Sequence, residues 1–474
     1  MKVLNLFLYE FNHFKKSSAK VITYLTFLIA CFYSIYNGFE LQNSHNETIL
    51  SIKLEHDKGI YELFNWFDKG LTGPEDKSWI DISNPTWALS LTPQYTIKEP
   101  SPLLPLGLGQ AEQYGFYKKI TNWSSTYDND MVQELTNPER LVNGNIDFSF
   151  LIIFLLPVLL IILIYNIRGL EQDFNFEKLI NVQFGSVSKW VLIRVSFYVL
   201  LLILSVFVII IGVSLINNVF ISNYSDILSL IGLFSGYVLC FAIIFYFIIL
   251  SSSGSSSIAF KMISFWLVFC IVIPGSVHQY ASIKYPVNYM TDFLDANRKE
   301  AYQIYELPID YLYYQLIDLY PNLSQTIHAS DEEIDNNIIS NSICALVNQL
   351  NKNAIKKIEL QNEAKNKLIN SSYWFNPVSF IQNKWNSLTM TDYYSYQLYR
   401  SEVQRVIDTR IELLVFECWN KTIVNKSLYK LYLKQLNTSK KSSLKANFID
   451  IDEISKSGDD DFYYMIPEKC DVTY

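Results

Sequence analysis

Histidine and cysteine, the residues most often found in metal sites and catalytic dyads, are few in this chain and widely separated. The five histidines lie at positions 13, 45, 56, 278 and 328, and the six cysteines at 31, 240, 270, 344, 418 and 470. Neither set has the H-E-x-x-H or C-x-x-C spacing of a zinc site. The G-x-S-x-G pattern of a nucleophile elbow is absent as well. The sequence therefore predicts no catalytic centre, no metal and no cofactor, and we do not expect the chain to be an enzyme.

Phosphate chemistry has no support either. A nucleotide-hydrolysing chain needs a glycine-rich loop of the form G-x-x-x-x-G-K-[ST], and no segment fits this pattern. The serine-rich segment 251–257 has one glycine and is better interpreted as a tight turn between two helices. Among the cysteines, Cys344, Cys418 and Cys470 could form a disulfide in an oxidising compartment, but their spacing selects no pair.

Five long apolar segments dominate the sequence. Half of the 474 residues are hydrophobic and 18% are charged, whereas a soluble domain has about a quarter of its residues charged. The net charge of −8 excludes a basic surface for nucleic acid. Since a helix needs roughly 20 apolar residues to cross a lipid bilayer, we predict a mainly α-helical membrane protein with five transmembrane helices. The apolar segments are 21–36, 148–167, 195–216, 227–250 and 263–283.

The distribution of lysine and arginine predicts the orientation of these helices. Basic residues gather before the first apolar segment and between the second and third, and this is typical of cytoplasmic loops. We therefore expect a multi-pass protein of the cell's inner (plasma) membrane with a cytoplasmic N-terminus. The predicted parts are the N-terminus and first transmembrane helix at 1–38, an extracytoplasmic domain at 39–147, transmembrane helices two to five at 148–283 with a cytoplasmic loop at 168–193, and a second extracytoplasmic domain at 284–474.

The two polar regions differ in pattern. Four prolines between positions 93 and 105 favour extended chain and turns, so the first region is expected to be α+β or irregular. Apolar residues at three-to-four spacing over 338–368 and 391–420 predict long helices, so the second is expected to be mostly α-helical.

The loop between the second and third apolar segments is the most informative part of the chain. It reads RGLEQDFNFEKLINVQFGSVSK over 168–189, with acidic residues around apolar ones. Residues 174–183 can form a short amphipathic helix at the membrane surface. Such a helix either presents an apolar edge to a soluble partner or simply connects two membrane helices, and this segment alone favours neither.

This loop resembles the E-x-x-x-G-T-L-x-x-L-L-x-x-P-x-S pattern of type-2 ABC exporter permeases. Glu171 matches the leading acid, Leu179 and Ile180 the apolar pair, and Ser186 or Ser188 the final serine. Asn175-Phe176 replaces the usual Gly-Thr, and Gly185 the usual proline. In that family the segment is a coupling helix, so the resemblance implies that Glu171, Phe174, Glu177, Leu179 and Ile180 contact a separate ABC ATPase subunit.

Other segments are similar to an uncharacterised bacterial subgroup of these permeases. They include SPLLPLGLGQAEQYGFYKKIT at 101–121, GNIDFSFLIIFLLP at 144–157 and DDDFYYMIPEK at 459–469. The resemblance implies a permease subunit that acts as a dimer, with a second copy or a paralogue, in ATP-driven export of a substrate. It also implies six membrane helices where the sequence has five apolar segments, so the sixth is either lost or truncated. A membrane-anchored extracytoplasmic binding or assembly protein without transport activity is the alternative.

Two prolines and one arginine inside the apolar segments have further interpretations. Pro157 and Pro274 each remove a backbone hydrogen bond within a membrane helix, and they act either as hinges or as static kinks. Arg194 lies near the cytoplasmic end of the third segment, from which we expect its side chain to extend to the membrane surface.

Overall fold

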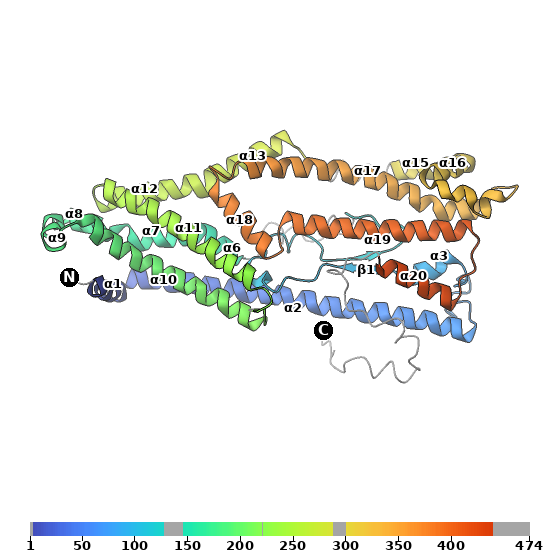
Figure 1. Ribbon diagram of the computed structural model, residues 1–474, viewed down its shortest axis with the longest axis horizontal. Helices are drawn as coiled ribbons and strands as arrows, with labels where there is room; N and C mark the ends of the chain where they lie inside the picture. Colours follow the sequence, from blue (N-terminus) through green and yellow to red (C-terminus); the bar gives the residue numbers. More distant parts are fainter. Residues whose placement is uncertain (1–2, 128–145, 220, 288–299, 439–474) are drawn as a thin grey trace.

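The computed structural model describes residues 3–127, 146–219, 221–287 and 300–438 of the chain. It is elongated, with an apolar helix bundle at one end and a more polar region, here called the distal module, at the other (Figure 1). Helix α2 runs along both parts. Cys470 lies outside the described residues.

Five helical segments are long and apolar enough to cross a membrane, which confirms the prediction of a mainly α-helical membrane protein. Two of them are composite, because each contains a π-helical turn between α-helical parts. The segments are α2 (Ser18–Lys69), the run of α6 (Phe148–Phe150), η2 (Leu151–Leu155), α7 (Leu156–Ile164) and α8 (Asn166–Asp173), then α10 (Val187–Ile216), α11 (Tyr224–Ser251), and the run of α12 (Ser255–Leu267), η3 (Val268–Val272) and α13 (Ile273–Lys284).

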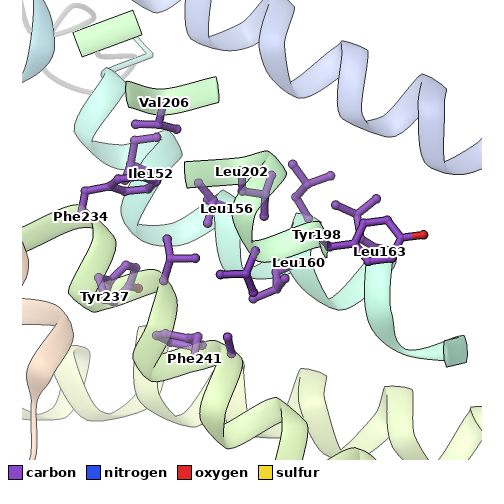
Figure 2. Close-up of a cluster of buried hydrophobic side chains, with 14 of the residues drawn as sticks. Ile152, Leu156, Leu160, Leu163, Tyr198, Leu202, Val206, Phe234, Tyr237 and Phe241 are labelled. Atoms are coloured by element: carbon purple, nitrogen blue, oxygen red, sulfur yellow. The ribbon is translucent and has the colours of Figure 1, made fainter. Parts of the chain in front are cut away.

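The bundle core forms where three of these helices meet. Figure 2 shows side chains of α7, α10 and α11 pointing toward one another, among them Leu160, Leu202 and Phe241. All three are buried. Because the contributing residues recur every three or four positions on each helix, one face of each helix is covered by its neighbours.

Helix α2 is much longer than the apolar segment at 21–36 that predicts it. It contains 52 residues, which at 1.5 Å per residue is about 78 Å. Beyond the apolar part, Ile49, Ile52, Ile60 and Leu63 lie on a buried stripe that packs on the distal module. The helix ends at Gly70, whose left-handed backbone caps it.

The distal module joins both polar regions in one core. Its first part contributes the far half of α2, helix α3 (Pro85–Leu91) and a two-stranded antiparallel sheet of β1 (Gln94–Ile97) and β2 (Tyr117–Ile120), in which Gln94 pairs with Ile120. Its second part is helical. The two long helices, α17 and α19, lie on the periodic segments 338–368 and 391–420 of the sequence. They begin after Asp335 and Asp392, whose side chains cap the helix N-termini. These helices are α15 (Ala301–Tyr305), α16 (Ile309–Leu319), α17 (Asn336–Ser371), α18 (Pro377–Leu388), α19 (Tyr393–Trp419) and α20 (Lys426–Thr438).

Candidate functional site

The loop between the second and third membrane helices lies at the end of the bundle that also carries the N-terminal helix α1 (Val3–Lys16) (Figure 1). It contains α8 and a second short helix, α9 (Glu177–Phe184). The sequence favours one helix over 174–183, but the structure divides the segment at Asn175, whose φ of 58° interrupts the helix. Asparagine tolerates this left-handed conformation better than most residues, so α8 and α9 form a helical hairpin.

Side-chain hydrogen bonds join this hairpin to the end of α11, to the following turn and to the start of α12. Arg168 donates from Nη1 to the backbone oxygen of Ile249 at 2.9 Å and from Nη2 to Glu177 Oε1 at 2.7 Å. The Gln172 amide oxygen accepts from the backbone N–H of Gly254 at 3.0 Å. Asp173 Oδ2 accepts from Ser255 Oγ at 2.6 Å. The hairpin is therefore fixed to the start of the fifth membrane helix as well as to the second.

Gly169 allows α8 and α12 to lie in direct contact. A Cβ atom at this position would be 2.5 Å from the Cα and Oγ atoms of Ser255. Real Cβ atoms do not approach that closely, so any larger residue would push the two helices apart. The contact places the hairpin and the fifth membrane helix in one rigid unit.

The hairpin presents an apolar surface to solvent, which we call the α8–α9 apolar surface. It consists of Phe174, Phe176, Leu179 and Val182, whose exposed fractions are 66%, 52%, 56% and 84%. The rings of Phe174 and Phe176 are 6.3 Å apart. Exposed apolar residues that lie together in this way mark a binding surface for a protein or a membrane more often than isolated ones do.

The five residues that the sequence assigns to ATPase contact do not all lie on this surface. Phe174 and Leu179 are on it, whereas Ile180 is buried and packs against the bundle core. Glu177 bonds to Arg168, which holds the pKa of its carboxyl below the usual range. Glu171 faces the bundle, 3.8 Å from Arg194. The structure thus adds Phe176 and Val182 to the exposed set.

A buried group of charged side chains lies directly behind the hairpin. Arg194 is only 4% exposed, so the expectation that it extends to the membrane surface is wrong. Its Nε lies 2.5 Å from Oε2 of Glu10, a fully buried residue of α1. Tyr198 donates to the same carboxylate at 2.7 Å, and Lys20 donates to the backbone oxygen of Leu163 at 2.6 Å. Arg194 stays inside because an acidic partner is there.

This charged group connects four elements at one end of the bundle: α1, α2, α8 and α10. This group was not predicted from the sequence, because Glu10, Lys20 and Arg194 lie in separate segments of the chain. The available signal was Glu10, the one acidic residue in an otherwise basic and apolar N-terminal segment.

Each candidate hinge proline is the second residue after a π-helical turn. Pro157 comes after η2 and Pro274 after η3. A proline at 157 cannot donate to the oxygen of Ile153, and the Tyr237 hydroxyl of α11 donates to that oxygen instead, at 2.5 Å. Tyr237 Oη also lies 4.0 Å from Cys270 Sγ within η3. One tyrosine therefore contacts both irregular turns, which are the usual sites of bending in a helix.

Metal and disulfide chemistry find no site in the described ranges. No group of three or more His, Cys, Asp or Glu residues there could bind a metal ion. Cys344 and Cys418 are free and buried in the distal core. Burial raises the pKa of Cys344 to about 12, so its thiol stays protonated and unreactive.

No protein-family model matches the chain, and neither a curated protein nor a solved structure matches it. The features of this chain that bear on its function are therefore the hairpin, the charged group behind it and the sequence resemblance.

Proposed function

We propose that the chain is the membrane-spanning permease subunit of an ATP-binding cassette transporter, which exports its substrate from the cytoplasm. A separate ATPase subunit would supply ATP hydrolysis, and a second permease copy or a paralogue would complete the pore. The observation that supports this most is the α8–α9 apolar surface, because it is both exposed and rigidly attached.

A cytoplasmic segment that transmits force from an ATPase to the membrane helices needs two properties. It must offer a contact surface to the motor, and it must move with the membrane helices rather than independently of them. The first property is met by Phe174, Phe176, Leu179 and Val182. The second is met by Arg168, which bonds the hairpin to the end of the fourth membrane helix, and by Gln172 and Asp173, which bond it to the turn before the fifth helix and to that helix's start.

In this proposal, closure of two ATP-bound ATPase subunits displaces the hairpin. The displacement reaches the fifth membrane helix through the turn at 251–254, and it reaches α1 and the third helix through Arg194. Coupling requires the ATPase pair to bind the two permease states with different affinities. The N-terminus, the hairpin and the turn would then lie in the cytoplasm of a bacterial cell, and the distal module outside its inner membrane.

The test is a double substitution on the apolar surface, Phe174→Asp with Val182→Asp. Both side chains are exposed, so the variant should fold and insert normally. The expected result is loss of co-purification with the proposed ATPase subunit and loss of ATPase stimulation. Ile423→Asp in the distal module is the matched control, because Ile423 is 76% exposed there, and it should leave the complex intact.

An undiminished complex in the double variant would contradict the proposal. It would favour a membrane-anchored extracytoplasmic binding or assembly protein without transport. The size of the distal module, which includes the 36-residue α17 and the 27-residue α19, is the observation that favours this second candidate.

A further inference from the structure

A cleft of about 390 Å³ lies where the distal module meets the bundle, far along the chain from the hairpin. It is lined by the end of α17, by α18, by the start of α19, and by one residue of α13, His278. Helix α18 packs into the bundle core through Val378, Ile381 and Trp385. The volume falls within the range of small-molecule sites, roughly 300–1,000 Å³.

Aromatic rings form one part of the lining. Tyr373, Phe380 and Tyr394 all line the cleft, and Phe380 and Tyr394 are 40% and 43% exposed. Tyr373 and Phe380 are 5.4 Å apart in an edge-to-face arrangement. Such rings offer flat apolar surfaces to a ligand.

Carboxamides form the other part. Asn383 donates to the hydroxyl of Tyr373 at 2.7 Å, so it positions that ring. Two carboxamide oxygens, Gln110 Oε1 and Asn386 Oδ1, are buried and accept no hydrogen bond from any group in the part of the chain that the structure describes. Neither oxygen is accessible from solvent, so the carboxamides that can meet a ligand are the exposed ones of Asn370 and Asn383.

Charge in the cleft is balanced. Lys384 is the one lysine among the lining residues, and Asp392 the one carboxylate. The Asp392 side chain already accepts from the backbone N–H of Ser395 at the start of α19. This balance favours an uncharged ligand over an anion or a cation.

We propose that this cleft binds a neutral glycosyl group. A sugar ring has apolar C–H faces that pack on aromatic rings, and its hydroxyls both donate and accept, as carboxamides do. Its hydroxyls would reach the exposed carboxamides of Asn370 and Asn383, and its faces would lie against Phe380 and Tyr394. The glycosyl group comes from a free oligosaccharide or from a glycolipid headgroup, since the cleft adjoins the membrane bundle. This inference does not depend on the proposed transport function.

The experiment uses the full chain in phosphatidylcholine nanodiscs free of sugar-based detergent. Saturation-transfer NMR measures binding of cellobiose, maltose and N,N′-diacetylchitobiose, and a second set of nanodiscs contains a galactosyl diacylglycerol. Tri-alanine is the peptide probe. Binding of a free disaccharide, or of the glycolipid alone, supports the proposal and identifies the source. Binding of none of them, or of tri-alanine as tightly as any saccharide, overturns it.

Three variants separate binding from folding. Tyr394→Ala should weaken saccharide binding about tenfold, while Tyr314→Ala, at an exposed tyrosine of α16, should leave it unchanged. Asn370→Ala removes an exposed carboxamide of the cleft, so it should weaken binding about tenfold without lowering the melting temperature. Unchanged binding by Asn370→Ala, or equal binding by both tyrosine variants, would refute the assignment.

Discussion

Removing either partner of the Glu10–Arg194 ion pair is expected to destabilise the bundle strongly. The two side chains are 0% and 4% exposed, and their closest atoms are 2.5 Å apart. In a Glu10→Leu variant, the guanidinium keeps the backbone oxygen of Ile167 at 3.2 Å and Glu171 at 3.8 Å, but it loses its closest charge. An uncompensated buried charge of this kind costs about 3–5 kcal/mol.

The double variant Glu10→Leu with Arg194→Met should behave differently. It removes both charges and fills their volume with apolar atoms, so its free energy of unfolding should lie within about 1–2 kcal/mol of the parent. Each single substitution would then lower the free energy of unfolding by much more than the double substitution does. This non-additivity is the signature of two residues in direct contact.

The assay is equilibrium unfolding in mixed micelles, followed by tryptophan fluorescence, for the parent, both single variants and the double variant. Glu363→Gln is the control, because its partner Lys367 is an exposed residue on the same helix and that pair should contribute nothing measurable. If the double variant loses as much free energy of unfolding as the two single variants together, the two side chains do not interact. Each would then contribute to stability independently.

Three further predictions concern the hairpin and the irregular turns. Tyr237→Phe should destabilise the parent by about 1–3 kcal/mol, because it leaves the Ile153 oxygen without a donor. In a Pro157→Ala background, where a backbone N–H is restored, the same substitution should have a much smaller effect on unfolding, and an equal effect would contradict the role given to Tyr237. Gly169→Ala should separate α8 from α12, cost about 1–3 kcal/mol and impair ATPase binding. Gly59→Ala, in open space on α2, should be neutral or stabilising by contrast. Arg168 lowers the pKa of Glu177 from its ordinary value of 4.5, so the stability that Glu177 contributes is complete above pH 4.5 and is lost as the pH falls through the lowered folded pKa. In unfolding measurements over a series of pH values, Glu177→Gln should remove this decrease in the free energy of unfolding at low pH. An unchanged decrease would show that the bond to Arg168 does not contribute to stability.

The five membrane-spanning helices could be predicted from the sequence because their signal is local. Length and apolar content decide whether a helix can cross a bilayer, and both are properties of one uninterrupted segment. The helices α17 and α19 were predictable for a similar reason, since each has periodic apolar residues and a capping aspartate. The continuation of α2 through 69 was missed, because its far half is amphipathic and its buried face depends on the distal module.

The loop at 168–193 was recognised from its position and its mixture of acidic and apolar residues. Which of its side chains face outward was decided by the break at Asn175, which sets the rotation of α9 relative to α8. Leu179 is exposed and the adjacent Ile180 is buried. One helical position is a rotation of about 100°, so neighbouring residues of equal hydrophobicity can have opposite roles.

The sequence alone predicts five membrane helices with a charged and apolar loop between two of them, because the hydropathy of a segment depends only on the residues of that segment. The tertiary structure alone decides that Arg194 is buried, that Tyr237 replaces the hydrogen bond lost at Pro157, and that the loop is fixed to the fifth helix. Each of these contacts joins residues that are more than 80 positions apart in the chain. Hydrogen bonds and ion pairs form only over a few ångströms, so no pattern within a single segment can reveal them.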